Sequence, residues 1–422
     1  MTSFSLDSHF AGVMGDLLGP EFPDEIGLAV SGGGDSMALL TLAHNWTRHM
    51  GVGLRVVTVD HGLRPESGAE AALVAAECAA LGHRHDVLRW QGWDGSGNLQ
   101  EAARTARLRL IGRWRGGLRH VLMAHTLDDQ AETVLMRLAR GSGVDGLAGM
   151  ADRRFVPQAT EDGGFWLMRP LLTVRRAELR HYLTVLKGAW VEDPSNADPR
   201  FDRVRMRQAL EILAPLGIDA AALAETAGRM ARAQAALRAR AAEAATRAVR
   251  VQHGDLLMDR DALAALEAET RLRLLAGGLQ YVSGRVYRPR ARALAAAADR
   301  VLSGGSASLH GCLMRAERAE IRLCREYAAV AETRAPVGAP WDGRFQLGGA
   351  AIAGLTVRAL GEAGAAQLPA RPEGLPYQSL IAHPAVFDGD RLVAFLPAGF
   401  GPEYDICRLT GQHGFAAFLT TH

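Results

Sequence analysis

The segment at residues 31–36 combines serine, glycine and aspartate in an order that can hold phosphate groups. Its members are Ser31, Gly32, Gly33, Gly34, Asp35 and Ser36. An apolar run at 26–30 precedes it and a second one, with helical spacing, follows at 37–46, which predicts a strand, a tight bend and a helix. Glycines permit positive φ and so let backbone N–H groups turn inward, while the two hydroxyls and the helix N-terminus add further donors. We therefore predict a phosphate-binding loop.

The residues around this loop separate it from other phosphate loops. No lysine follows the glycines, which excludes a Walker loop, and Met37 stands where a dinucleotide fingerprint needs its last glycine. The form S-G-G-x-D-S instead resembles the pyrophosphate-binding loop of ATP pyrophosphatases, enzymes that cleave ATP to AMP and pyrophosphate. A plain glycine connector between strand and helix is the alternative, and the two serines and the aspartate argue against it. The resemblance implies ATP but leaves the second substrate open.

Polar residues also follow two further predicted strands. Asp60 and His61 come at the end of an apolar run at 54–60, and His125 follows another at 121–124. These strands alternate with helical patterns, which predicts parallel βαβ units in an open, doubly wound α/β sheet of the Rossmann-like type. Ligands on such sheets bind beyond the carboxyl ends of the strands. We therefore expect Asp60, His61 and His125 to lie beside the glycine loop.

Three carboxylates lie just after His125 on a predicted helix that begins near residue 127. They are Asp128, Asp129 and Glu132, and helical spacing places Asp128 and Glu132 on one face. Carboxylates at a phosphate-binding edge suit Mg²⁺ or the ammonium group of a substrate. The alternative for Asp128 and Asp129 is that they only stabilise the positive end of the helix. The sequence leaves both interpretations of these two residues open.

Seven short motifs, in order, resemble the tRNA(Ile)-lysidine synthase family. The match is strong over roughly residues 24–210, and a fainter likeness covers 308–326. The motifs are S-G-G-G-D-S at 31–36, V-D-H-G-L-R at 59–64, N-L-Q-E-A-A-R-T-A-R at 98–107, A-H-T-L-D-D-Q-A-E-T at 124–133, R-G-S-G-V-D-G-L-A-G-M at 140–150, R-P-L-L at 169–172 and E-D-P-S-N-A-D-P-R-F at 192–201.

The resemblance implies a defined reaction and a set of partners. The family uses ATP and free L-lysine to modify the wobble cytidine of tRNA(Ile) with a CAU anticodon. The 2-carbonyl oxygen of cytosine attacks the α-phosphate and releases pyrophosphate, and the ε-amine of lysine then displaces AMP to give lysidine. The motifs carry no information on oligomeric state.

The resemblance also implies roles for individual residues. The loop at 31–36 would hold the pyrophosphate portion of ATP, and the nucleotide site would include Asp60, His61 and His125. Asp128, Asp129 and Glu132 would bind lysine or Mg²⁺, and Asp35 and Asp129 would be the magnesium ligands. Arg104 and Arg107, one turn apart on a helix, would stabilise charge that develops on the phosphate.

Composition places the chain among ordinary globular proteins of more than one domain. It has 422 residues, of which 48% are hydrophobic, and a formal net charge of +2, which neither favours nor excludes nucleic acid. The four cysteines are scattered and form no C-x-x-C pair, so zinc, a cysteine-ligated cluster and a disulfide framework are not expected. No basic leader and no apolar run of spanning length is present. We expect a cytoplasmic protein with no membrane partner.

We expect three domains. The first, 1–215, is the catalytic ATP-binding domain; 216–330 is a helical, tRNA-contacting domain with a small β element; and 331–422 is a small β-containing domain. Residues 332–343 are expected to form a linker because of their prolines. The last domain contains a hairpin at 386–393, with an Asp-Gly turn.

Two arginine-rich stretches could contact tRNA phosphates. One is the Ala/Arg-rich helix predicted at 223–249, for which a solvated helix face is an equal alternative. The other combines Arg285, Arg288, Arg290 and Arg292 with the nearby Tyr281 and Tyr287.

Two rival functions stay open. Another ATP pyrophosphatase is the first, but a tRNA thiolase generally needs paired cysteines, and an amide-forming enzyme with its own glutaminase domain would need more than the 30 residues ahead of the loop. A non-catalytic, nucleotide-gated RNA-binding protein is the second. The presence of Asp35, Asp128, Asp129 and Glu132 argues against it.

Overall fold

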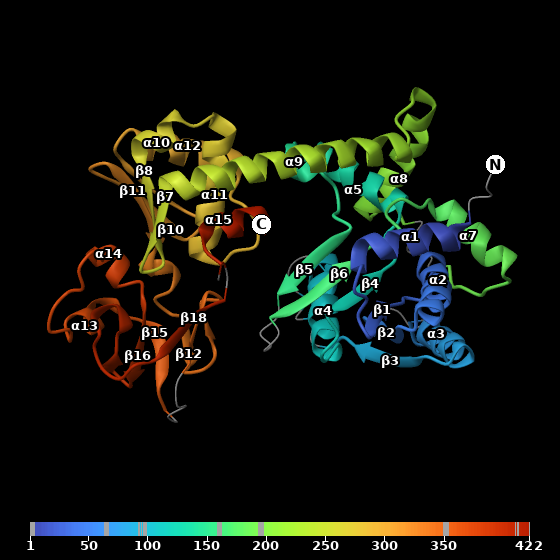
Figure 1. The fold of residues 1–422 in the computed structure, drawn as a ribbon, viewed down its shortest axis with the longest axis horizontal. Coiled ribbons are helices and arrows are strands. Elements are labelled where there is room, and N and C mark those ends of the chain that lie inside the picture. The colour runs from blue at the N-terminus through green and yellow to red at the C-terminus, as the bar shows by residue number, and fades with distance from the viewer. Residues whose placement is uncertain are drawn as a thin grey trace. The chain divides into compact units, whose positions relative to one another are not determined.

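The computed structural model describes residues 5–62, 67–91, 93, 95, 99–157, 163–192, 198–348, 354–409, 411 and 413–421. The chain forms two compact units, Met1–Gln234 and Ala235–His422, and Figure 1 shows the elements of both. The finer division into three domains, at 215 and 330, remains a prediction. Within the described segments, no helix combines the length and apolarity needed to cross a membrane.

The first unit is built on a sheet of predominantly parallel strands. In the described part of the chain its order is β3-β2-β1-β4-β6-β5. Strand β1 lies between β2 and β4 and runs parallel to both, with Ala29 opposite Val57 and Met123. The carboxyl ends of these three strands therefore meet at one edge. The predicted α/β fold is confirmed. The strands are β1 (Glu25–Ala29), β2 (Gly53–Asp60), β3 (Arg84–Arg89), β4 (His120–Met123), β5 (Arg153–Pro157) and β6 (Gly164–Met168).

The outer pair of strands was not predicted from the sequence. Strand β6 runs parallel to β4, whereas β5 pairs antiparallel with β6. In the middle of this pair Phe155 and Trp166 lie opposite each other, with ring centroids 5.4 Å apart, and both are exposed. Strand β5 gives a weak sequence signal because only Val156 of its five residues is buried. Strand β6 reads G-F-W-L-M, an apolar run that we did not assign to a strand from the sequence.

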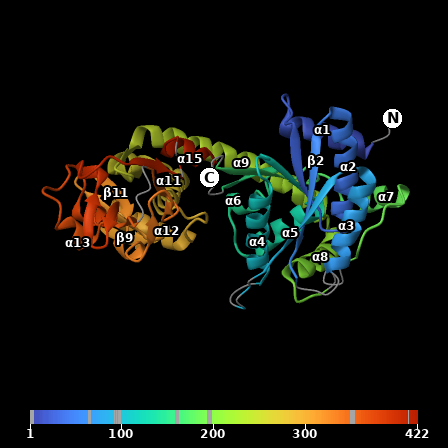
Figure 2. The ribbon, with the colours of Figure 1, turned by 90° about the horizontal axis from the view of Figure 1, so that it is seen from below.

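Alternate side chains of the central strands fill two cores on the two faces of this sheet. Leu28 and Leu122 pack with α1, α2, α3 and α7 on one face, while Val121 and Met123 pack with α4 on the other. Figure 2 shows α1, α2 and α3 together beside β2. Helices on both faces are what a doubly wound sheet requires. Their bounds are α1 (Leu6–Leu18), α2 (Gly34–Met50), α3 (Ser67–Leu81), α4 (Leu99–Trp114) and α7 (Arg176–Val185).

A third, smaller core joins the remaining helices of this unit. Val134 and Leu135 of α5 (Leu127–Ala139) pack against Leu223 and Ala227 of α9 (Ala220–Ala248), with α8 (Asp202–Leu213) alongside. Between α5 and β5 the chain forms the short helix α6 (Val144–Leu147), followed by a glycine at which φ is positive, Gly149. This packing fixes α5, the helix that carries the predicted carboxylates.

The second unit begins within α9 and contains an antiparallel sheet of order β7-β8-β11-β10-β9. The buried face of this sheet packs against α11, α12 and α15 in one core. The elements are β7 (Val249–Gln252), β8 (Asp255–Asp259), α10 (Arg260–Ala265), α11 (Ala268–Ser283), α12 (Ala291–Leu302), β9 (Ser306–Leu309), β10 (Cys312–Glu317), β11 (Glu320–Arg325) and α15 (Phe415–Thr421).

The C-terminal part of this unit adds two small sheets, of order β12-β15-β16-β17 and β13-β14-β18. The predicted hairpin is confirmed, since β16 and β17 pair antiparallel around Gly389, where φ is +58°. The elements are β12 (Arg334–Pro336), β13 (Pro340–Trp341), β14 (Phe345–Gly348), β15 (Thr356–Ala359), α13 (Gly361–Ala365), α14 (Tyr377–Leu380), β16 (Pro384–Asp388), β17 (Arg391–Ala394) and β18 (Asp405–Arg408).

The expectation of a linker at 332–343 is wrong. This segment contains β12 and β13, and Trp341 is fully buried, with Nε1 donating to the carbonyl of Thr333. The next residue, Asp342, accepts from Arg325 at 2.9 Å and from Arg344 at 2.6 Å. The prolines suggested a linker, but the aromatic and the ion pairs make the segment part of the core.

Candidate active site

A cleft of about 610 Å³ opens at the carboxyl ends of β1, β2 and β4. The loop at 31–36, the strand ends at Asp60 and His125, and residues of α5, α7 and α8 line it. This is the edge of the sheet at which the strand order predicts ligand binding. The cleft is large enough for a nucleotide and part of a second substrate.

The glycine loop is held closed by its two serines. Oγ of Ser36 accepts the N–H of Ser31 at 3.1 Å, lies 3.2 Å from Oγ of Ser31, and donates to the carbonyl of Gly33 at 2.8 Å. Helix α2 begins directly at Gly34. The N–H of Ser36 already donates to the carbonyl of Gly33, so the N–H groups ahead of it, at the N-terminus of the helix, are the ones suited to an anion.

Only one of the three glycines uses positive φ. Gly32 has φ of +87°, and a Cβ there would lie 3.3 Å from the carbonyl oxygen of Glu70. Gly33 has an ordinary extended conformation as the N-cap of α2, and a Cβ on Gly34 would touch the ring of Trp190. The loop thus needs Gly32 for its backbone geometry, whereas a Cβ at Gly34 would make only an ordinary van der Waals contact.

The residues at the end of β2 provide a carboxylate and a neutral imidazole. Asp60 accepts the N–H of Gly62 at 2.8 Å, and this hydrogen bond holds its pKa below the usual value. Burial, reinforced by the nearby Arg107, lowers the pKa of His61 to about 4. His61 is therefore uncharged at neutral pH and can serve as a hydrogen-bonding group.

His125 and Arg107 line the cleft, but Arg104 does not. Burial, followed by the charge of Arg169, lowers the pKa of His125 to about 3, so this imidazole is neutral as well. Burial, with Arg203 and Arg104, also lowers the pKa of Arg107, whose Nε has no hydrogen-bond partner among the described residues. Arg104 is exposed and is not among the cleft-lining residues. Its predicted role remains untested.

The three predicted carboxylates of α5 occupy three different environments. Asp129 forms a capping box with Thr126. Oδ2 of Asp129 accepts hydrogen bonds from the N–H of Thr126 at 2.8 Å and from the hydroxyl of Thr126 at 2.9 Å. Asp128 accepts the backbone N–H of Arg176 at 2.7 Å and so caps the first turn of α7. Asp129 and Glu132, rather than Asp128 and Glu132, line the cleft.

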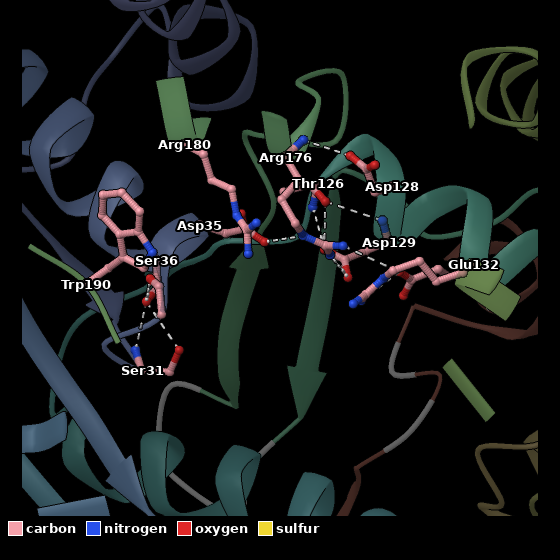
Figure 3. A network of polar contacts seen from close by, with 12 residues as sticks. Ser31, Asp35, Ser36, Thr126, Asp128, Asp129, Glu132, Arg176, Arg180 and Trp190 are labelled. Atoms are coloured by element: carbon pink, nitrogen blue, oxygen red, sulfur yellow. Dashed lines mark hydrogen bonds and ion pairs between the residues drawn. The ribbon is translucent and has the colours of Figure 1, made fainter. Parts of the chain in front are cut away.

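Arg176 joins the carboxylates of two helices (Figure 3). Its Nε donates to Asp35 at 2.9 Å, Nη2 to Asp129 at 3.1 Å, and Nη1 lies 3.5 Å from Glu132. Burial alone would raise the pKa of Asp129, but Arg176 and the N–H of Thr126 outweigh it and lower that pKa. For Asp35, burial outweighs Arg176, and the pKa is raised.

Glu132 is the most deeply buried of these acids, with a side chain only 1% exposed. Oε1 faces Arg176 and also accepts from Nη2 of Arg207 at 3.0 Å. Oε2 is buried and has no hydrogen-bond partner among the described residues. Burial and the neighbouring Asp129 raise the pKa of Glu132 against the opposing effect of Arg207 and Arg176. A carboxylate with one unpaired, buried oxygen is suited to receive a charged donor.

Sequence reasoning missed several arginines of the cleft. Arg176 follows the R-P-L-L motif by four residues, and its position at the start of a predicted helix could have drawn attention to it. Arg203 and Arg207 of α8 also line the cleft, and Arg180 donates to Glu192, a further cleft-lining residue. The motif residues 63–64, 98 and 193–197 lie outside the described residues.

The residues present fit a Mg²⁺ ion that is shared with ATP phosphates. Among the described residues, no group of three or more His, Cys, Asp or Glu side chains could hold a metal by itself. Both oxygens of Asp129 already accept hydrogen bonds, whereas Asp35 uses only Oδ2 toward Arg176. Mg²⁺ is commonly bound through one or two carboxylates plus substrate phosphates and water. Asp35, in the first turn of α2, is therefore the better candidate for a magnesium ligand.

The sheet, the serine-glycine loop and the cleft define a PP-loop nucleotide-binding protein. Residues 6–213 match a PP-loop domain family. The tRNA(Ile)-lysidine synthase of Ruegeria pomeroyi is 45% identical over 403 residues, which cover 95% of each chain. That of Bradyrhizobium sp. is 47% identical over 292 residues, 66% of this chain and 80% of its own. The chain belongs to the tRNA(Ile)-lysidine synthase family, a family of ATP-dependent ligases, and the resemblance predicted from the motifs is confirmed.

Among solved structures, the U34-tRNA thiolase NcsA from Methanococcus maripaludis resembles part of the chain. The alignment covers 54% of this chain and 78% of that chain, with 15% sequence identity and a TM-score of 0.44. A similarity this distant carries no inference about substrate.

Proposed function

We propose that this cleft joins free L-lysine to the wobble cytidine of tRNA(Ile) with a CAU anticodon. In the first step, the 2-carbonyl oxygen of cytosine attacks the α-phosphate of ATP, and pyrophosphate leaves. In the second, the ε-amine of lysine attacks C2 of the adenylated base, AMP leaves, and the amine loses a proton. The products are lysidine, AMP and pyrophosphate.

The glycine loop supports the first step. We infer that the N-terminus of α2 and the loop serines would bind the departing pyrophosphate, and that Asp35 would hold Mg²⁺ there. When bound, Mg²⁺ supplies positive charge that offsets the charge developing on the leaving group. Arg107 adds a buried guanidinium to the same cleft. His61 and His125, being neutral, can donate or accept a hydrogen bond there without adding charge.

The environment of Glu132 supports lysine as the second substrate, and it is the observation on which this assignment depends. Glu132 lines the cleft that also holds the phosphate loop, and the Oε2 atom of this buried carboxylate has no hydrogen-bond partner among the described residues. A primary ammonium group carries three donors and a positive charge, which would satisfy that oxygen. The amine must be neutral when it attacks, so a neighbouring carboxylate can also accept its proton.

The second unit supplies a surface suited to tRNA. Arg285, Arg290 and Arg292 are exposed around the loop between α11 and α12, and Tyr287 in the same loop is 76% exposed. Arginines contact phosphates and exposed aromatics stack on bases. Tyr281 does not take part, because it is buried between Phe415 and Phe418.

Two arginines of α9 form ion pairs with glutamates of the same helix. Arg229 pairs with Glu225, and Arg247 with Glu243, each one turn away. Such pairs favour a solvated helix face over a phosphate-binding arm.

We propose that residues 1–215 carry catalysis, that 216–330 contact tRNA mainly through the α11–α12 loop, and that 331–422 help to position the RNA. Since the substrate is a tRNA, we propose that the protein acts in the cytoplasm.

The test is the incorporation of radiolabelled lysine into purified tRNA(Ile) transcripts, with and without ATP. We expect ATP-dependent labelling of the CAU transcript and no labelling of the same transcript with a GAU anticodon. Pyrophosphate release with the CAU transcript but without lysine labelling would instead indicate a different nucleophile, such as the sulfur donor of a thiolase. Nucleotide binding without pyrophosphate release would indicate a non-catalytic RNA-binding protein.

A further inference from the structure

The guanidinium of Arg176 contacts carboxylates that come from two different helices. Each of its three nitrogens faces a different acid: Nε faces Asp35 of α2, while Nη2 and Nη1 face Asp129 and Glu132 of α5. The side chain of Arg176 is only 18% exposed. A planar fork with fixed donor directions can hold three acceptors in one arrangement, which a flexible ammonium cannot.

The backbone of Arg176 is also attached to α5. The N–H of Arg176 donates to Asp128 at 2.7 Å, at the first turn of α7. Both the main chain and the side chain of Arg176 therefore attach α7 to the start of α5. Because α5 holds both ends of this residue, the guanidinium has little freedom to rotate away from the carboxylates.

This arrangement has a consequence for Glu132. Its Oε1 atom faces Arg176 and accepts from Arg207, so one oxygen is held by two guanidinium groups. With Oε1 held in this way, the orientation of the carboxylate is restricted, while Oε2 stays buried and unpaired among the described residues. Without Arg176, Asp35, Asp129 and Glu132 would repel one another and would no longer share a partner.

We propose that Arg176 is a positioning residue for the ligation step: by holding Asp35, Asp129 and Glu132 together, it keeps Oε2 of Glu132 oriented to receive the ε-ammonium group of lysine. The proposal rests on the proposed function. Arg176 itself does not contact the reacting atoms. Its effect is expected on the binding and orientation of lysine and to a smaller extent on the activation of cytidine by ATP.

The neighbouring Arg175 offers a matched control. It precedes Arg176 in the chain, but its side chain is 48% exposed and pairs with Asp219 at 3.3 Å, away from the acidic cluster. The test compares Arg176→Gln, Arg176→Lys and Arg175→Gln in the full-length protein. Two rates are measured: tRNA-dependent pyrophosphate release without lysine, and lysine incorporation as a function of lysine concentration.

For Arg176→Gln we expect the KM for lysine to rise at least about 10-fold, with a smaller loss in pyrophosphate release. For Arg176→Lys we expect the charge to be kept and pyrophosphate release to be nearly restored, while the KM for lysine stays high because an ammonium cannot reach all three acids. Arg175→Gln should match the wild type in both rates. If Arg176→Gln does not fold, the lysine variant carries the comparison.

A wild-type KM for lysine in a folded Arg176 variant would overturn the positioning role. An equal loss in both rates would also overturn it, because that result would assign Arg176 to the nucleotide step or to general stability. Absence of lysine incorporation by the wild-type enzyme would refute the proposed function instead, so the two failures are distinguishable.

Discussion

The hydroxyl oxygens of Ser31 and Ser36 lie 3.2 Å apart and so connect the two ends of the glycine loop. Ser36 is buried, and its hydroxyl also donates to the carbonyl of Gly33. These side-chain contacts hold the loop in its bent form, and the backbone N–H groups at the start of α2 are the preorganised phosphate donors that this form presents. Preorganised donors cost little rearrangement when charge develops on a phosphate.

Substitution of the loop residues should remove activity while the fold is kept. For Ser36→Ala and Asp35→Ala we expect turnover to fall by at least about 100-fold, as for the loss of other preorganised charge-stabilising groups. The measurement is tRNA-dependent pyrophosphate release, with circular dichroism to check folding. Thr41→Ala is the control, since Thr41 lies on the same helix and its hydroxyl donates to the carbonyl of Met37 within that helix. Wild-type activity in either loop variant would contradict the assignment of the loop.

The two neutral histidines predict how stability depends on pH. Burial lowers the pKa of His61 to about 4 and that of His125 to about 3, from an ordinary value of 6.5. Between these values the unfolded chain binds protons that the folded chain does not. The contribution of these two histidines to the free energy of unfolding is therefore fully present above pH 6.5 and is lost as the pH falls toward 4.

Urea unfolding at pH 7.5 and pH 5 checks this dependence. We expect the wild-type midpoint to fall between the two conditions, and the fall to be smaller in His61→Asn/His125→Asn. His49→Asn, at an exposed position of α2, should behave like the wild type. An equal fall in the double variant and the wild type would show that these two imidazoles do not titrate on unfolding.

The loop between α11 and α12 predicts a salt-dependent contact with tRNA. For Arg288→Ala/Arg290→Ala we expect weaker tRNA binding and a shallower dependence on salt, by about one unit of log–log slope for each arginine that contacts a phosphate. Filter binding at several salt concentrations gives the slope. Arg229→Ala/Arg247→Ala, which removes paired arginines of α9, should leave the slope unchanged. The reverse result would assign the contact to α9.

The buried pairs of Asp342 predict a stability effect in the second unit. Asp342 contacts Arg325 and Arg344, and all three side chains are at most 10% exposed. Removing one partner leaves buried charges without compensation, so Asp342→Ala should cost about 3 kcal/mol. Asp390→Ala removes a fully exposed partner of Arg358 and should leave the midpoint close to that of the wild type. Thermal unfolding of the two variants makes the comparison, and similar midpoints would contradict the buried network.

Local patterns were enough to predict the catalytic fold and part of the site. The strand ends at Asp60 and His125, and the loop at 31–36, follow from short-range apolar runs and glycines, and parallel strands bring them to one edge. Arg176 could not be found in this way. It lies 47 residues from Asp129 and 141 from Asp35 along the chain. Only the packing of α7 against α2 and α5 brings these charges together.

The same limit explains the errors in the second unit. The prolines at 336 and 340 are typical of a linker, but the burial of Trp341 depends on strands formed far away in the sequence. Tyr281 lies near the arginines of the α11–α12 loop in sequence, yet α15 covers it, and Arg408 lies 3.6 Å from its ring centroid. Composition and spacing report local structure, whereas the partner of a buried side chain depends on the whole fold.

The most direct test of the account separates the two half-reactions in Glu132→Gln. This substitution keeps the shape of the side chain but removes the charge that we assign to the lysine ammonium group. The measurement is single-turnover pyrophosphate release and labelled-lysine transfer in the same reaction with the CAU transcript. Glu211→Gln, an exposed acid on α8, is the control. If Glu132 binds the ammonium group of lysine, Glu132→Gln will release pyrophosphate at near the wild-type rate and transfer little or no lysine. Lysine transfer at the wild-type KM and rate would contradict it.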